Sequence, residues 1–136
     1  MNDTIARLQA AVNRHDPEGM AACMAADYRS EQPAHPNRGF GGPEQVAANW
    51  TRMFAGVPDI AGEVVDSTID GRTTWTEWEW RGHHLDGSLF HTRGVILMGL
   101  DDDDLIAWAR FYMEEVEQDG AAIEETVTQL SGEGRR

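Results

Sequence analysis

The hydrophobic period of the chain changes near residue 60, and this change constrains the fold more than any other feature of the sequence. Before it, apolar residues recur every three or four positions, as at Ile5, Leu8 and Val12, which is typical of amphipathic helices. After it, apolar and polar residues alternate, as they do along strands with one buried face. Helices followed by strands predict an α+β domain, with the helices packed on one face of an antiparallel sheet.

Three helices are expected before the change. The first begins after Asn2 or Asp3. The second begins at Asp16, where an N-cap, a proline and an acidic residue follow one another. Its apolar stripe would contain Met20, Cys23 and Met24, with Tyr28 as a further candidate. Residues 31–42, rich in Pro and Gly, predict a loop, and the third helix begins near Pro43.

Four strands are expected after the change, over residues 60–69, 73–82, 89–100 and 105–114. Asp-Gly pairs at residues 70–71 and 86–87 favour hairpin turns between them, and four aspartates at 101–104 form a charged turn. The chain from residue 118 is expected to form a short helix that frays. Residues 1–130 are therefore interpreted as one domain, and 131–136 as a disordered tail.

The composition excludes several classes of function. Asp and Glu total 24 against 11 Arg, with no Lys, so the formal charge is −13. Such a chain cannot present the positive surface that nucleic acids or anionic membranes require. The absence of Lys also excludes Schiff-base chemistry and a P-loop. Eleven acidic residues against three Arg lie in residues 101–136, and we expect most of this charge to be solvated.

Other motifs are missing from the sequence. The single cysteine, Cys23, excludes an internal disulfide and fits a reducing compartment. No apolar run approaches the ~20 residues that span a bilayer, and the first residues lack the features of a secretory signal. We therefore expect a cytoplasmic location. Zinc motifs and glycine-rich dinucleotide motifs are absent as well, so neither a metal nor an organic cofactor is expected.

Three stretches carry a resemblance to a known family: residues 35–42 (HPNRGFGG), 75–82 (WTEWEWRG) and 106–114 (IAWARFYME). In this order they resemble the nuclear transport factor 2 superfamily, which includes ketosteroid isomerases, limonene epoxide hydrolases and SnoaL-like polyketide cyclases. The resemblance implies a cone-shaped sheet wrapped around the helices, with a deep apolar pocket inside. It also implies a homodimer formed through the outer face of the sheet. The catalytic carboxylate of the hydrolases and cyclases lies at the position that Glu114 holds here.

The last strand contains a column of side chains suited to a pocket. Trp108, Arg110, Tyr112 and Glu114 share one face because alternate residues of a strand point the same way. A carboxylate can transfer a proton, while a phenol and a guanidinium can polarise an oxygen. The alternative is that Arg110 and Glu114 form an exposed pair and that Tyr112 packs across strands.

Two further segments contribute candidates. Trp78 and Trp80 share a strand face that the resemblance directs toward the pocket, whereas a bulge would direct Glu77 there instead. His35 and Arg38 lie in the loop before the third helix, where side chains can close a pocket mouth. The alternative is that His35 and Pro36 only build a rigid turn and that Arg38 bonds acidic neighbours.

These observations predict a small enzyme that moves a proton on an apolar small molecule, as in isomerisation, cyclisation or water addition. Glu114 would handle the proton, with Tyr112, Arg110 and His35 as its catalytic partners. The expected substrate-binding residues are Trp50, Met53, Trp78, Trp80, Trp108 and Arg38. One alternative is a non-catalytic module for ligand binding or dimerisation. The other is an epoxide hydrolase, which would need Glu77 to converge with Glu114.

Overall fold

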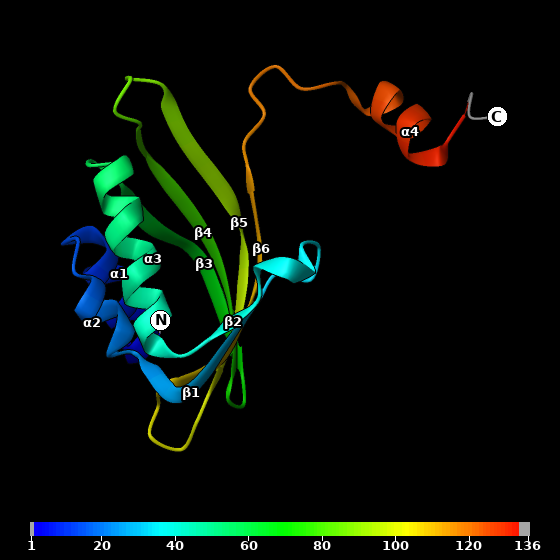
Figure 1. Cartoon of the computed structure of the whole chain (residues 1–136). Coiled ribbons are helices and arrows are strands. Elements are labelled where there is room, and N and C mark those ends of the chain that lie inside the picture. Colours follow the sequence, from blue (N-terminus) through cyan, green and yellow to red (C-terminus); the bar gives the residue numbers. More distant parts are fainter. Residues whose placement is uncertain (1, 134–136) are drawn as a thin grey trace.

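A six-stranded sheet carries three helices on one face, which we call the inner face (Figure 1). The computed structural model describes residues 2–133. The elements in chain order are α1 (Asp3–Asn13), α2 (Pro17–Ala21), β1 (Met24–Glu31), the 3-10 helix η1 (Pro36–Arg38), β2 (Phe40–Gly41), α3 (Pro43–Gly56), β3 (Ala61–Asp70), β4 (Thr73–His83), β5 (Leu89–Leu100), β6 (Ile106–Glu115) and α4 (Ile123–Ser131). The predicted α+β class is confirmed.

The strands lie in the order β2-β1-β6-β5-β4-β3, and the sheet is not closed. The pairs from β3 to β6 are antiparallel, as the sequence predicts, and the bounds of these strands agree with the four expected strands to within one residue. The sheet is nevertheless mixed, because β1 pairs with β6 in parallel. The expectation of a wholly antiparallel sheet missed this pair, since it treated the residues of β1 as helical.

Helices α1 and α3 form where the sequence predicts them. The side chain of Asn2 caps α1 by accepting a hydrogen bond from the backbone N–H of Thr4 at 2.7 Å. The apolar stripe of α1 is buried at Ile5, Leu8 and Val12. Proline suits the first position of α3. The backbone N–H at this position has no partner within a helix, so nothing is lost by its absence in Pro.

The predicted second helix is wrong beyond its first five residues. It ends at Ala21, and the chain enters strand β1 at Met24. Tyr28 and Ser30 are both buried on the inner side of this strand. Ala-rich residues 21–26 have high helix propensity, but pairing with β6 and burial of Tyr28 override this local preference.

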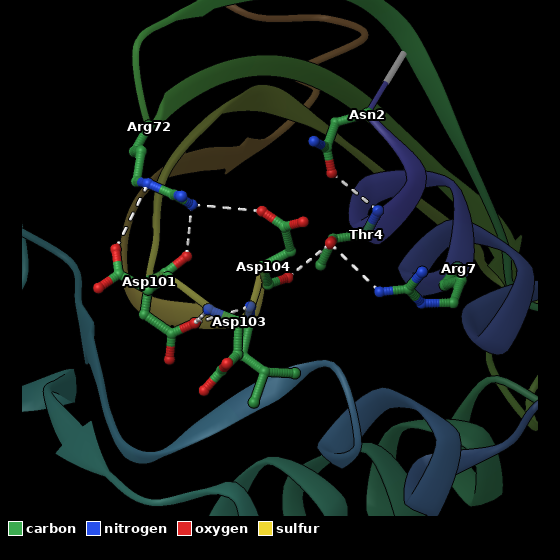
Figure 2. A network of polar contacts seen from close by, with 9 residues as sticks. Asn2, Thr4, Arg7, Arg72, Asp101, Asp103 and Asp104 are labelled. Carbon is green, nitrogen blue, oxygen red and sulfur yellow. Dashed lines mark hydrogen bonds and ion pairs between the residues drawn. The ribbon is translucent and has the colours of Figure 1, made fainter.

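The four aspartates at 101–104 close the turn between β5 and β6 and hold it against α1 (Figure 2). The carboxylate of Asp101 accepts hydrogen bonds from the backbone N–H groups of Asp103 and Leu105. Arg72 donates to the Asp101 carbonyl at 2.6 Å and to the Asp104 carboxylate at 3.3 Å. These acids therefore shape the turn, in addition to the solvated role expected of them.

Thr4 connects α1 to this turn, and its removal should weaken the fold. Its hydroxyl is buried and donates to the Asp104 carbonyl at 2.6 Å. Thr4→Val keeps the shape but leaves the carbonyl without this donor, so we expect the free energy of unfolding to fall by about 1–2 kcal/mol in urea titrations. Thr51→Val is the matched control, because the Thr51 hydroxyl bonds only within α3. Equal losses in both variants would contradict this role for Thr4.

The described residues place α4 outside the core. Among residues 2–133, no helix is long and apolar enough to cross a membrane. The predicted helix near the C-terminus is present as α4. The predicted disordered tail, 131–136, includes residues 134–136, which lie outside the described part of the chain.

Candidate functional site

A cavity of about 800 Å³ lies between the helices and the inner face of the sheet. This volume falls in the range of sites for small organic molecules. Seven aromatic residues contribute to its lining. They are Tyr28, Phe40, Trp50, Trp78, Trp80, Phe90 and Phe111.

Strand β4 and helix α3 supply the tryptophan walls. Trp78 and Trp80 face inward because the register between β4 and β5 runs without a shift from Thr73 to His83. The bulge that would have turned Glu77 inward is absent from this pair. Trp50 meets Trp80 edge to face, with ring centroids 5.2 Å apart, and Met53 follows it along the lining. Together with Arg38, the structure therefore brings five of the six expected substrate-binding residues to one cavity.

Polar groups within the cavity are few. Tyr28 and Ser30 line it from β1, and Thr92 from β5. Burial raises the pKa of the Tyr28 phenol, and a hydrogen bond with Ser30 opposes this shift in part. The phenol therefore keeps its proton at neutral pH and can donate a hydrogen bond. The indole N–H of Trp78 instead donates to the Thr76 hydroxyl at 2.8 Å, so it is satisfied within the sheet.

The mouth of the cavity is charged. Arg38, Gln32, Glu114, Glu115 and Glu117 border it. The Arg38 guanidinium donates to the Gln32 amide oxygen at 3.1 Å. In the described part of the chain, Arg38 forms no ion pair with a carboxylate.

His35 and Glu114 meet at this mouth although 79 positions separate them in sequence. The Nε2 atom of His35 lies 2.9 Å from Oε1 of Glu114, and the side chains are 36% and 65% exposed. A carboxylate only accepts, so this contact places the imidazole proton on Nε2. The pair connects the loop before η1 to the end of β6.

The structure corrects the predicted orientation of β6. A register shift between Gly99 and Leu100 inserts an extra residue near the start of β6, so Ile106 and Ala109 both line the cavity. Trp108 and Arg110 lie on the outer face, with the Arg110 guanidinium 4.4 Å from the centroid of the Trp108 ring. Tyr112 shares this face and is half exposed. These three residues therefore do not line the cavity as expected.

The same alternation changes which carboxylate faces inward. Ala109, Phe111 and Met113 line the cavity, and Glu115 continues this series. Glu115 is directly opposite Thr92 of β5, which also lines the cavity. Glu114 is opposite Arg93, and both belong to the outer side of the sheet. The Glu114 carboxylate reaches the cavity mouth near the end of β6, where it meets His35. Glu115 could not be identified from the sequence, because a single sequence does not show where a register shift lies.

Glu77 is also on the outer face, where its carboxylate accepts from Arg93 at 2.6 Å. Glu79 beside it contacts His91 at 2.8 Å and Arg81 at 3.2 Å. The His91 contact and then Arg81 hold the pKa of Glu79 below its usual value. The Glu77–Glu114 pair that epoxide hydrolysis would need is therefore not formed inside the cavity.

The described residues contain no group of three or more His, Cys, Asp or Glu side chains arranged to hold a metal ion. Cys23 is buried, and its thiol donates to the Gly19 carbonyl at 3.5 Å. Burial raises the pKa of this thiol. Cys23 thus belongs to the core.

Comparisons with known proteins agree with this architecture. The sequence profile of the SnoaL-like domain matches residues 5–109. A hypothetical protein of Catenulispora acidiphila with a ketosteroid isomerase-like fold, solved with trimethylamine, has a TM-score of 0.73 at 18% identity, covering 82% of this chain and 86% of its own. A Mycobacterium tuberculosis protein solved with estradiol-17β-hemisuccinate has a TM-score of 0.69 at 21% identity, covering 80% and 89%.

A candidate SnoaL-like polyketide cyclase from Jannaschia sp. extends the match to 95% of this chain and 90% of its own, with a TM-score of 0.69 at 20% identity. No curated protein shows significant sequence similarity to the chain. The solved structures thus share the fold, and the matched profile covers most of the chain.

Proposed function

The chain belongs to the SnoaL-like domain family, and on that basis we propose that it is a small-molecule enzyme that transfers a proton at the mouth of its cavity without a cofactor. One observation carries the proposal: an aromatic cavity of about 800 Å³ has an inward-facing carboxylate, Glu115, at its mouth. The aromatic walls suit an apolar ligand, and a carboxylate beside an apolar site is suited to act as a base.

In this proposal the roles expected of Glu114, Arg110 and Tyr112 pass to Glu115, Arg38 and Tyr28, which line the cavity. Glu115 takes the proton from carbon and returns it. Arg38 stabilises the negative charge that develops on an oxygen of the substrate near the mouth. Tyr28, kept protonated by burial, donates to a polar group deeper in the cavity. Trp50, Met53, Trp78 and Trp80 contact the apolar body of the substrate.

His35 and Glu114 act as positioning residues in this proposal. Their contact at 2.9 Å holds the loop after β1 against the end of β6. Arg38 lies three residues after His35, so the contact also fixes where the guanidinium enters the mouth. Two of the structural relatives hold small organic molecules, which supports a small-molecule ligand here.

Nitrobenzisoxazole is a direct probe of this chemistry because its reaction needs only a base. The base takes the C–H proton, the electron pair forms the nitrile, and the N–O bond breaks to give a coloured phenolate. We expect saturable turnover by the protein, faster than by acetate at the same carboxylate concentration, because the cavity orients the probe. A rate no greater than that of acetate, despite measured binding, would favour a non-catalytic binding module.

We also propose that two copies associate through the outer face of the sheet. Trp75 and Tyr112 are half exposed on this face, and large aromatic side chains are enriched in protein interfaces. Sedimentation should give the mass of two chains at micromolar concentrations. A monomer at every concentration would exclude this association.

A further inference from the structure

Helix α4 presents an apolar stripe with no partner within the described chain. Ile123, Val127 and Leu130 follow one another at helical spacing and are 73%, 49% and 81% exposed. No described residue of α4 is buried. Figure 1 shows α4 clear of the sheet and of the other helices. A helix of nine residues is marginal in water alone, so its stability requires a surface against which the stripe can pack.

A surface of matching character lies on the outer face of the sheet. We define the outer patch as Trp75, Val95, Leu97, Trp108, Arg110 and Tyr112. Trp75, Leu97 and Arg110 lie side by side across three strands, and Val95 pairs with Tyr112 in the next row. Directly paired residues point to the same face, so the patch is continuous.

The charges of the two surfaces are complementary. Within residues 2–133, Arg110 has no carboxylate partner and lies against the Trp108 ring. The nearby acids Glu77 and Glu79 already contact Arg93, His91 and Arg81. Helix α4 contains two glutamates and no basic residue, and Glu124 flanks its apolar stripe. The outer patch therefore offers an available cation where the helix offers an acid.

The connection to the domain permits this contact to form between copies. Seven residues, 116–122, join β6 to α4, and an extended segment of this length spans about 23–25 Å. In the single chain both the stripe and the outer patch are present, yet they remain apart. A second copy at the outer face brings another outer patch within reach of α4.

We propose that α4 of each copy docks its stripe on the outer patch of a second copy, with Glu124 beside Arg110. This inference rests on the proposed association through the outer face and names the element that makes it. Each copy thus places its α4 on the other copy, as expected for a two-fold symmetric dimer. The matched SnoaL-like profile spans residues 5–109, and α4 lies outside this span.

Sedimentation of full-length variants tests the inference. Val127→Asp puts a charge into the stripe and should raise the dimer dissociation constant at least about tenfold, because a buried unpaired charge costs several kcal/mol. Thr128→Asp adds the same charge on the opposite side of α4 and should leave the constant unchanged. Trp75→Glu in the outer patch should have the same effect as Val127→Asp. If Trp75→Glu raised the dissociation constant but Val127→Asp left it unchanged, the role of α4 would be overturned, while the proposed association through the outer face would stand.

Disulfide trapping then identifies which copy supplies the helix. Chains carrying Val127→Cys are mixed with chains carrying Trp75→Cys and oxidised; the native Cys23 is buried. We expect a cross-link between the two kinds of chain. A third protein carries both substitutions in one chain. A cross-link that forms within this chain but not between the two single-cysteine chains would show that α4 folds onto its own sheet, which would contradict the inference. A wild-type protein that is monomeric throughout would exclude both the association and the docking of α4.

Discussion

Replacing Glu115 by Gln should lower kcat for nitrobenzisoxazole by at least about 100-fold, because positioned general bases contribute roughly 10²–10⁴ to a rate. Gln keeps the size and much of the hydrogen bonding of Glu but cannot accept the proton. The aromatic walls are untouched by this change, so KM should remain within a small factor of the wild-type value. Steady-state kinetics with the probe measure both quantities.

The neighbouring carboxylates provide matched controls for this prediction. Glu114 and Glu117 border the same mouth, so Glu114→Gln and Glu117→Gln remove the same charge at nearly the same place. If only negative potential at the mouth mattered, all three variants would lose similar activity. We expect losses below about tenfold in these two, since Glu114 belongs to the other alternate set of β6 and Glu117 lies beyond the end of the strand. A loss in Glu114→Gln that exceeds the loss in Glu115→Gln would reassign the base to Glu114.

Trp78→Ala should have the largest effect on stability. Trp78 is 1% exposed and is the largest of the fully buried side chains. Truncation of a buried Trp costs about 3–5 kcal/mol, which is a large fraction of the 5–15 kcal/mol that stabilises a typical domain. The variant also removes the donor to Thr76, whose hydroxyl in turn donates to the Ile96 carbonyl at 2.7 Å. Urea unfolding followed by far-ultraviolet circular dichroism measures the loss.

Trp75→Ala is the control for this substitution. Trp75 lies on the same strand but on the outer face, and is half exposed. Measured at a concentration at which the copies are separate, its loss should be within about 1 kcal/mol, as for most surface changes. Trp78→Phe should lie between the two. Equal losses at positions 75 and 78 would contradict the assignment of the inner face.

The parts of the fold governed by local pattern could be predicted from sequence. Strand alternation from residue 60 onward, the Asp-Gly turns and the start of α3 at Pro43 all correspond to elements of the structure. Strand β1 could not be predicted in the same way, because residues 21–26, which lead into it and form its start, favour a helix when considered alone. Its conformation depends on pairing with β6, which is more than 70 residues away.

At the candidate site, too, the sequence could predict the orientation of only some of the side chains. The family resemblance directed Trp78 and Trp80 toward the pocket, and both line the cavity because β4 pairs with β5 without a register shift. On β6 a single extra residue opposite Gly99 and Leu100 reverses which alternate set faces inward, so Glu115 continues the inward series, while Glu114, on the other set, borders the mouth of the cavity. A bulge leaves no clear pattern in one sequence, because its position depends on how neighbouring strands pair.

The most direct measurement for the proposed function is a crystal structure of the wild-type protein with nitrobenzotriazole. This compound resembles the probe but has an N–H in place of the reactive C–H, so it binds without reacting. We expect the ring of the bound nitrobenzotriazole to lie against Trp50 and Trp80, with its N–H donating to a Glu115 oxygen at about 2.6–3.2 Å. Binding outside the cavity, or inside it with the N–H directed away from Glu115, would contradict the proposal.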